Sequence, residues 1–245
     1  MNNRLNAAIR YQLADYRTSI LVFVGINITL ILLVLGGFFF IEINGEISYT
    51  AYAFAAAIFM LVCGIVGPRP ALRLCAQLGT GRKSAFLSLF PAAVVAALIL
   101  ALMGEVIVGG AQILSRNDPH LFFSDLYAMT YMGWDATLTL PQHLQSVLFH
   151  TCLMLACYGF GLFCTTLFWR LNKIGRIIAG ITMAACFTFG LPLLSIYVQI
   201  PMMFLMEFFI ASPWNGMAVF LVIFLFFSII AWFLVRNVHI RAGSK

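Results

Sequence analysis

Six long stretches of the chain contain no Asp, Glu, Lys or Arg, and they constrain the fold more than any other feature. They cover residues 18–41, 47–68, 84–104, 136–169, 177–206 and 208–235. An α-helix rises about 1.5 Å per residue, so about 20 apolar residues cross the roughly 30 Å hydrocarbon core of a bilayer. We therefore predict an all-α integral membrane protein, a single transmembrane domain over residues 1–245, with spans at about 19–41, 50–67, 86–109, 145–168, 176–198 and 215–235.

The composition excludes the soluble alternatives. Hydrophobic residues make up 63% of the chain and charged residues only 9%, whereas a soluble domain is about 45–50% apolar and about 25% charged. Most of this surface cannot face water, so soluble enzymes, disordered tails and disulfide scaffolds are excluded. The partner implied first is the lipid bilayer.

The distribution of basic residues predicts the topology. With the N-terminus in the cytoplasm, 13 of the 14 Lys and Arg residues fall on the cytoplasmic side, and only Arg116 lies outside. Short cytoplasmic loops of membrane proteins carry this excess of basic residues. We therefore expect both termini in the cytoplasm. The net charge of +6 then reflects topology and does not support nucleic-acid binding.

Residues 3–17 have the pattern of an amphipathic helix. Leu5, Ile9, Leu13 and Tyr16 recur at helical spacing, and polar and basic side chains occupy the other face. A basic helix that directly precedes a span suits the inner membrane interface. We predict an interfacial elbow helix here, with a solvated extension as the alternative. Its residues of interest are Arg4, Leu5, Ile9, Arg10, Leu13 and Arg17.

The loop between the second and third spans predicts a short helix. Pro68 and Pro70 end the second span, because proline cannot continue the helical hydrogen-bond ladder. Residues 71–78 then read as two helical turns, and Gly79 and Gly81 end them. We expect a rigid cytoplasmic knob at about 71–80, with an ordinary basic loop as the alternative. The GTGRKS sequence lacks the spacing of a phosphate-binding loop, so the chain does not bind ATP by itself.

Two outer segments carry further expectations. The aromatic residues of segment 110–144 predict a belt along the outer interface, with a lid over an exit as the alternative. The apolar piece between Pro201 and Pro213 has only 11 residues and contains Glu207. Because it is too short to cross the bilayer, we predict a re-entrant segment at about 200–213. The alternative is a fifth span that continues to about residue 206.

Few residues within the spans are suited to chemistry. Glu105 is the only acid within a span, which makes it a candidate for ion or proton coupling, although its place near the outer end also allows hydration. His143 and His150 share one helix face, but the histidines do not form a pattern for haem ligation. Hydrolase and metalloprotease motifs are absent from the sequence. We therefore predict no catalytic residues, no metal site and no cofactor bound by this chain.

The arrangement of these segments resembles the permease subunit of a type-2 ATP-binding-cassette exporter. The resemblance covers the whole chain in layout. It is most specific at residues 72–86, LRLCAQLGTGRKSAF, which are similar to the leucine-rich coupling stretch and Gly-x-x-Arg-Lys turn of that family.

The resemblance implies a transport subunit, in the cell membrane of a bacterium, that is not itself an enzyme. Two permeases, identical or paired with a sister chain, would each dock on a separate ATP-binding subunit, which holds ATP and Mg. The cargo would be hydrophobic or amphipathic, such as a peptide, lipid or drug. The implied docking residues are Leu72, Arg73, Leu74, Gln77, Leu78, Gly79, Arg82 and Lys83, and the pathway or gate candidates are Asn27, Thr29, Glu105, Thr182, Thr188, Ser195 and Glu207.

Two other functions stay open. An ion- or proton-coupled secondary transporter would more often show internal repeats and a charge at the membrane midplane. A non-transporting membrane scaffold would need neither the elbow nor the knob. The sequence favours the exporter permease over both.

Overall fold

A computed structural model describes residues 2–40, 47–49, 51–77, 82–115, 121–133, 138–185 and 199–236 of the chain. This described part is almost entirely helical, with one pair of short strands. Its elements are α1 (Asn2–Phe40), β1 (Ile47–Tyr49), α2 (Ala51–Val66), α3 (Pro68–Gln77), α4 (Arg82–Leu87), α5 (Leu89–Ser115), β2 (Leu121–Phe123), α6 (Leu126–Tyr131), α7 (Leu140–Arg170), α8 (Lys173–Ala185), α10 (Gln199–Ala211) and α11 (Pro213–Arg236).

Five helices of the described part are long and apolar enough to cross a membrane. They cover Asn6–Leu33, Ala51–Leu72, Lys83–Ile113, Leu140–Arg170 and Pro213–Arg236. Many of their large apolar side chains are exposed on the outside of the bundle, among them Val106 and Val222. The chain is therefore a multi-pass membrane protein. Of the predicted span 176–198, α8 covers the first part, and residues 186–198 lie outside the described residues.

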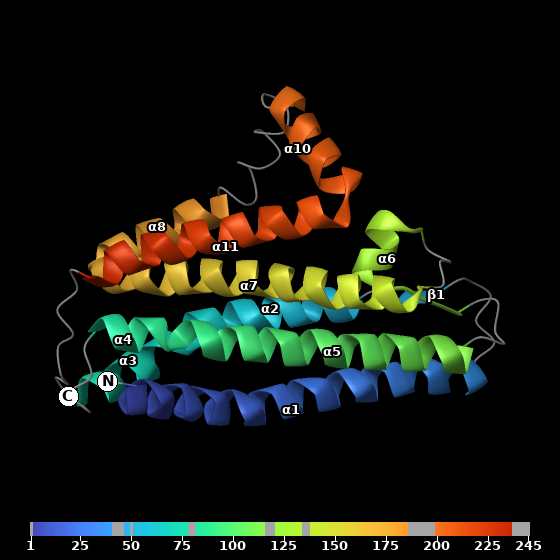
Figure 1. Ribbon diagram of the computed structural model, residues 1–245, viewed down its shortest axis with the longest axis horizontal. Coiled ribbons are helices and arrows are strands. Elements are labelled where there is room, and N and C mark those ends of the chain that lie inside the picture. Colours follow the sequence, from blue (N-terminus) through green and yellow to red (C-terminus); the bar gives the residue numbers. More distant parts are fainter. Residues whose placement is uncertain are drawn as a thin grey trace.

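The five long helices lie side by side, with α7 in the middle against α2, α5 and α11 (Figure 1). One end of the bundle holds α3, α4, the start of α1 and the end of α11, and we call it the α3 end. The opposite end holds α6 and the strand pair, and we call it the α6 end. Both α7 and α11 run from the α6 end to the α3 end, so the chain must return between them, through residues 171–212.

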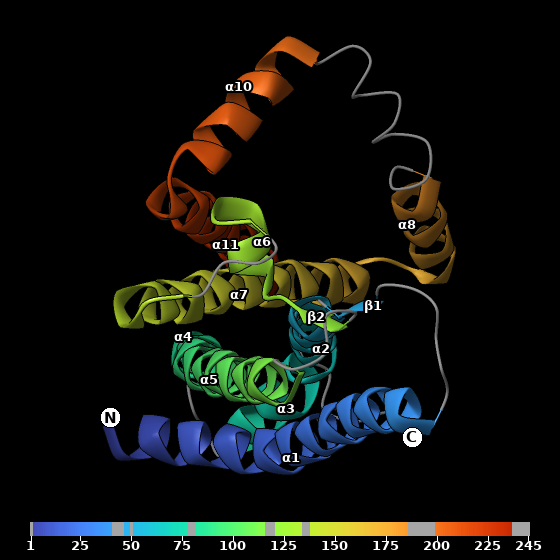
Figure 2. The ribbon, with the colours of Figure 1, turned by 90° about the vertical axis from the view of Figure 1, so that its right-hand side faces the viewer.

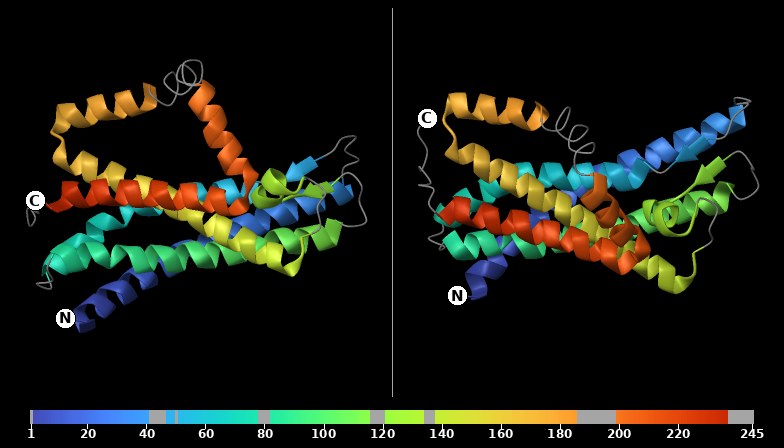
Figure 3. Two further views of the ribbon diagram at one scale, coloured as in Figure 1. Left: turned by 45° about the horizontal axis from the view of Figure 1, so that its top comes forward. Right: turned by 90° about the horizontal axis from the view of Figure 1, so that it is seen from above.

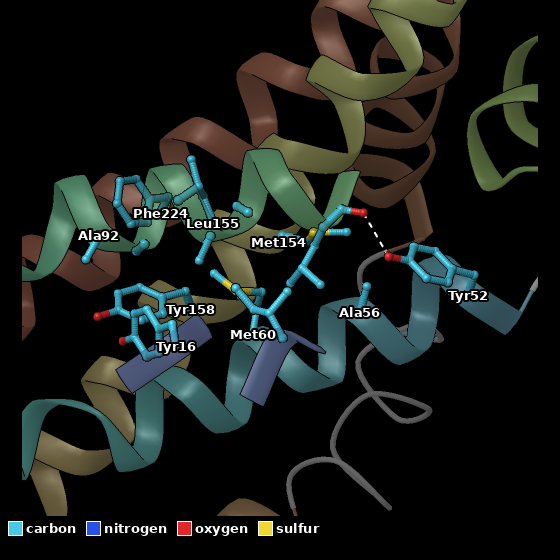
Figure 4. Close-up of a cluster of buried hydrophobic side chains, with 14 of the residues drawn as sticks. Tyr16, Tyr52, Ala56, Met60, Ala92, Met154, Leu155, Tyr158 and Phe224 are labelled. Carbon is cyan, nitrogen blue, oxygen red and sulfur yellow. Dashed lines mark hydrogen bonds between the residues drawn. The ribbon is translucent and has the colours of Figure 1, made fainter. Parts of the chain in front are cut away.

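The core lies where α2 and α7 cross (Figure 4). Met60, Met154 and Tyr158 are fully buried there. Gly64 of α2 and Gly161 of α7 let the two backbones touch, because a Cβ on either glycine would overlap a carbonyl oxygen of the facing helix. The Tyr52 hydroxyl donates a hydrogen bond of 2.8 Å to the Leu100 carbonyl and so fastens α2 to α5.

The structure joins the predicted elbow helix to the first span. α1 is one helix of 39 residues, or about 58 Å at the α-helical rise, which is nearly twice the hydrocarbon thickness. The sequence Asp15–Ile20 contains neither Gly nor Pro, so nothing breaks the helix where we expected a junction. The basic residues Arg10 and Arg17 are exposed, as the amphipathic pattern predicted.

A short helix follows α2 in the structure, and it starts earlier than the two turns that we predicted. Val66 ends α2, Gly67 makes a turn, and Pro68 is the first residue of α3. Proline is well tolerated at the first position of a helix, where its missing N–H has no partner to lose. A second break separates α4 from α5 at Ser88. Pro91 lacks the N–H that would bond to the Leu87 carbonyl four residues earlier, which explains this break.

α8 (Lys173–Ala185) and most of α10 (Gln199–Ala211) stand apart from the five long helices. Figure 2 shows α8 and much of α10 projecting away from the five long helices, and Figure 3 shows the same from two further sides. Isoleucines on α8 and methionines on α10 are exposed, including Ile174, Ile181, Met203 and Met206. At 13 residues α10 is too short to cross a bilayer, and its re-entrant placement stays a prediction.

Among the described residues, the outer aromatic side chains Phe123, Tyr127 and Tyr131 do not form the belt that we expected. Tyr127 is fully buried, and Phe123 is nearly so. Tyr127 packs edge-on against Phe149 of α7, within a cluster that also contains Met217 of α11. The prediction was wrong because alternating aromatic and acidic residues are equally compatible with a short helix that folds back over the end of the bundle.

Candidate functional site

The inner face of α3 is fixed to the bundle by small and apolar side chains. Pro68 is fully buried, and Leu72 is only 2% exposed. Leu72 packs with Ala8 of α1, Ala85 of α4 and Trp169 of α7. Ala71 belongs to a second cluster, which consists of Phe86, Leu89, Leu162, Ala231 and Val235. A helix held by α1, α4, α5, α7 and α11 at once cannot move without moving the bundle.

α1 strengthens this attachment through one hydrogen bond and one packing contact. Gln12 donates through Nε2 to the Ser88 hydroxyl at 3.1 Å, and both side chains are buried. One turn further along, Tyr16 lies over Gly67, where a Cβ would come within 2.7 Å of the tyrosine hydroxyl. The start of α1 is therefore attached to the α2–α3 turn and the α4–α5 turn.

The outer surface of the α3 end is cationic. Exposed basic residues here are Arg10, Arg17, Arg69, Lys83, Arg170, Lys173, Arg176 and Arg236. The Arg69 guanidinium lies 5.7 Å from the centre of the Trp169 ring, which orients it by a cation–π contact. Beside α4, a groove of about 430 Å³ is lined by Lys83, Leu87, Trp232 and Arg236. Such a surface suits the acidic groups of a partner protein or of lipid headgroups.

The structure describes the predicted docking residues only in part. Leu72 is buried and Lys83 is exposed. The side chains of Arg73, Leu74, Gln77 and Arg82 lie outside the described part, and so do residues Leu78 and Gly79. Among the elbow residues, Ile9 and Leu13 are half-buried, and the side chains of Arg4 and Leu5 lie outside the described part.

The structure does not gather the pathway candidates into one channel within the described residues. Asn27 is buried in α1, and its Nδ2 donates to the Phe23 carbonyl at 2.9 Å. Thr29 is exposed on α1, and its hydroxyl donates to the Gly25 carbonyl at 2.9 Å. Thr182 is exposed on α8, and Thr188 and Ser195 lie outside the described residues. Glu207 lines a hollow of about 410 Å³ on α10, with Met203, Met206, Ile210 and Ala211.

Glu105 has partners that the sequence did not predict. It lies near the α6 end of α5, and one of its carboxylate oxygens is 2.9 Å from His143 Nδ1 on α7. The Ser146 hydroxyl bonds to its other oxygen. Asp125, just before α6, and His150 on α7 complete a partly buried cluster. The spacing of His143, Ser146 and His150 on one helix face was a signal for their grouping, but no sequence pattern links them to Asp125.

Asp125 is the member of this cluster that lies outside the long helices. Burial alone would raise the pKa of its carboxyl, but the contacts with His150, the Ser146 hydroxyl and the Leu126 N–H outweigh burial. The pKa of Asp125 therefore lies below its ordinary value. The carboxylate is ionised at neutral pH, next to a second acid.

Comparison with known proteins does not add an identification. No family model, no curated protein sequence and no solved structure matches the chain. The function therefore has to be argued from the residues and their geometry.

Proposed function

We propose that this chain is the permease subunit of an ATP-driven exporter of the ATP-binding-cassette type. The observation that supports this most is α3, a short helix between two long apolar helices that is packed rigidly into the cationic end of the bundle. A helix in this position, with no room to move independently of the bundle, is suited to receive force from a partner. Residues 72–86 support the same proposal through their resemblance to the coupling stretch of that family.

The proposed mechanism uses α3 as a lever. A separate ATP-binding subunit docks on α3 and on the basic start of α4, at Arg82 and Lys83, and its closure on ATP and Mg displaces the docked helix. Because Ala71 and Leu72 are buried against helices from all parts of the bundle, displacement of α3 moves the bundle as a body. Rigid-body rocking between two states then alternates access to the two sides of the membrane.

A second permease, identical or a sister chain, completes the transport path in this proposal. The isoleucines of α8 and the methionines of α10 are exposed in the single chain, and lipid or a second copy would cover them. The hollow around Glu207 on α10 is bordered otherwise by apolar side chains. A path with such walls suits hydrophobic or amphipathic cargo, such as a peptide, a lipid or a drug-like molecule.

The proposal places the α3 end in the cytoplasm of a bacterial cell. Eight exposed basic residues of the described part lie at this end, and the insertion rule puts such residues inside. Because α1 begins and α11 ends at the α3 end, both termini are then cytoplasmic.

The test is purification of the tagged protein from its own host in mild detergent, with mass spectrometry of the proteins that accompany it. We expect a stoichiometric ATP-binding subunit. The double variant Arg73→Glu with Arg82→Glu should lose this subunit while the bundle stays folded, because both charges lie on the predicted docking surface. As a matched control, Arg170→Glu with Lys173→Glu makes the same charge change at the same end of the bundle, at the α7–α8 junction, and should retain it.

Two outcomes contradict the proposal. If the docking variant retains the subunit as well as the control does, α3 is not the docking helix. If the wild-type chain purifies alone and its reconstituted vesicles show no ATP-dependent transport, the exporter assignment is wrong. Ion- or proton-coupled transport through Glu105 is then the next function to test.

A further inference from the structure

Three side chains from three separate elements meet at the α6 end of the bundle. Glu105 comes from α5, Asp125 from the segment between β2 and α6, and His150 from α7. One ligand atom from each lies within 4.8 Å of the other two. The two carboxylates are largely buried, with 16% and 14% of their side-chain surfaces exposed, and His150 is 4% exposed. Two acids are rarely buried together without a compensating positive charge.

The position of Asp125 is set by several contacts. The strands pair in parallel with Ile47 opposite Leu121, which fixes the segment that leads to Asp125. Gln112 of α5 donates to the Phe123 carbonyl at 2.7 Å, and the Leu126 N–H donates to Asp125 Oδ1 at 2.9 Å. On the other side, the Tyr127 hydroxyl bonds to Gln145 of α7 at 2.8 Å. The cluster is therefore held in place by contacts outside it.

The orientation of His150 requires a cation. Its Nδ1 lies 2.8 Å from the backbone carbonyl of Ser146, which can only accept a hydrogen bond, so Nδ1 carries a proton. In a neutral imidazole, Nε2 then presents a lone pair. Nε2 lies 3.0 Å from Asp125 Oδ1, itself an acceptor. Two lone pairs at this distance repel unless a proton or a metal ion lies between them.

The hydrogen-bond geometry favours the metal ion over the proton. Nε2 of His150 is buried and has no well-directed hydrogen-bond partner among the described residues, although Asp125 Oδ1 is so close. The carboxylate oxygen therefore lies off the direction in which an N–H would point. Two ligands of one ion need no such alignment. With metal–ligand distances of about 2.0–2.1 Å, they lie about 2.9 Å apart at a right angle and about 3.4 Å apart at the tetrahedral angle.

The contacts of Ser146 also require a further positive centre in the cluster. Its hydroxyl lies within bonding distance of a Glu105 oxygen and, at 2.5 Å, of Asp125 Oδ2. A serine has one proton to donate, so its hydroxyl can donate to only one of the two carboxylate oxygens. One of the two contacts is therefore unmatched unless another positive centre holds the carboxylates together.

We propose that Glu105, Asp125 and His150 bind a divalent transition-metal ion of the Zn²⁺ class. One imidazole nitrogen and two carboxylate oxygens are ligands that such ions accept, and three protein ligands leave a position for water. The contact between His150 Nδ1 and a backbone carbonyl is the usual outer contact of a metal-binding histidine. The ion joins α5, the β2–α6 segment and α7 at the α6 end, so its role is to fasten the outer segment to the bundle.

His143 orients this site but does not complete it. Its Nδ1 lies 2.9 Å from Glu105 Oε2, and 41% of its side chain is exposed. A histidine that holds a ligating carboxylate is an outer-shell partner, and loss of such a partner typically weakens metal affinity about 10–100-fold. The variant His143→Ala should therefore bind the ion more weakly without abolishing binding.

The test is direct metal binding by the full-length protein in detergent. A tag without histidines is used, and bound metal is removed with EDTA before one Zn²⁺ per chain is added. After gel filtration, metal analysis should find one Zn²⁺ per chain. Competition with a chromophoric chelator should show that His150→Ala and Asp125→Asn each weaken the affinity by at least about tenfold. Asp15→Asn, which removes an exposed carboxylate at the α3 end, is the matched control and should bind as the wild type does.

Substitution with Co²⁺ separates this site from the free cysteines of the bundle. A site made of carboxylates and imidazole gives weak visible bands without the intense near-ultraviolet band of thiolate ligation. Failure of the wild-type chain to retain one ion, a thiolate band, or unchanged affinity in folded His150→Ala would each overturn the proposal. The metal stoichiometry and the Co²⁺ spectrum are measured on the wild-type chain, so they test the proposal even if the variants do not fold. A folded chain that retains no metal would show that protons alone hold the cluster together.

Discussion

At the scale of single residues, two glycines determine how closely the central helices approach. Gly64 of α2 faces the Tyr158 carbonyl, and Gly161 of α7 faces the Leu61 carbonyl. Lipid tails are as apolar as leucine, so helices in a membrane gain little from burying apolar surface and depend on close packing. The contact between α2 and α7 therefore rests on the absence of two Cβ atoms.

We predict that Gly64→Ala and Gly161→Ala each lower the free energy of unfolding by about 1–3 kcal/mol, because a Cβ would overlap facing backbone that cannot move aside. The measurement is equilibrium unfolding in mixed detergent and SDS micelles. Gly25→Ala is the control, because a Cβ at that position of α1 meets no described atom within 4 Å. Alanine there should leave stability unchanged or raise it by up to about 1 kcal/mol through helix propensity. If Gly64→Ala and Gly25→Ala changed the free energy of unfolding by the same amount, the packing argument would be refuted.

Sequence reasoning at this scale found single residues but not their partners. Glu105 is recognisable from the sequence as an unusual acid within a span. That Glu105 meets Asp125 and His150 depends on how the β2–α6 segment folds back over the helices. Residues 20 or more positions apart become neighbours through topology, which hydrophobic patterns and spacing do not encode.

At the scale of elements, α3 depends on Leu72 for its attachment. This side chain is 2% exposed and packs with Ala8, Ala85 and Trp169. We predict that Leu72→Ala destabilises the protein by about 2–3 kcal/mol, because truncating a buried leucine leaves a cavity. If α3 is the coupling helix, the variant should also lower the rate of ATP-dependent transport. This loss should be larger than the loss in binding of the ATP-binding subunit.

Leu87→Ala is the matched control for this prediction. Leu87 lies on neighbouring α4 but is 59% exposed, so its truncation should change the free energy of unfolding by less than about 0.5 kcal/mol. Unfolding in mixed micelles compares the two variants directly. A loss of stability in Leu87→Ala equal to that in Leu72→Ala would show that α3 is not held by the contacts described above.

The helices themselves were the most predictable elements. Long charge-free stretches correspond to α2, α5, α7 and α11, because length and apolarity alone decide what can cross a bilayer. Helix boundaries were less predictable. α7 begins at Leu140 rather than near residue 145, because Gln142 reaches back to the Thr139 N–H at 2.7 Å and caps an earlier start. α5 continues past Gly109 and Gly110 to Ser115, since glycine weakens a helix without ending it.

At the scale of the whole molecule, the two ends of the bundle differ in charge. The exposed basic residues of the described part gather at the α3 end, and Glu105 and Asp125 lie at the α6 end. This asymmetry agrees with insertion of the chain with its α3 end in the cytoplasm. It also separates the two proposed sites, with docking of an ATP-binding subunit at one end and a metal ion at the other. A variant at either site should therefore leave the other site intact.

The directions of α7 and α11 predict the topology of the segment between them. Both run from the α6 end to the α3 end, so we predict that the chain crosses the membrane in the opposite direction between Arg170 and Pro213. In a variant without native cysteines, Asn172→Cys should react with an impermeant thiol reagent only after the cells are permeabilised. Met206→Cys on α10, whose side chain is exposed, should react in intact cells. Thr139→Cys, just before α7, should also react in intact cells and is the control for a position on the outer side. Labelling of positions 172 and 206 from one side only would contradict the predicted crossing between α7 and α11.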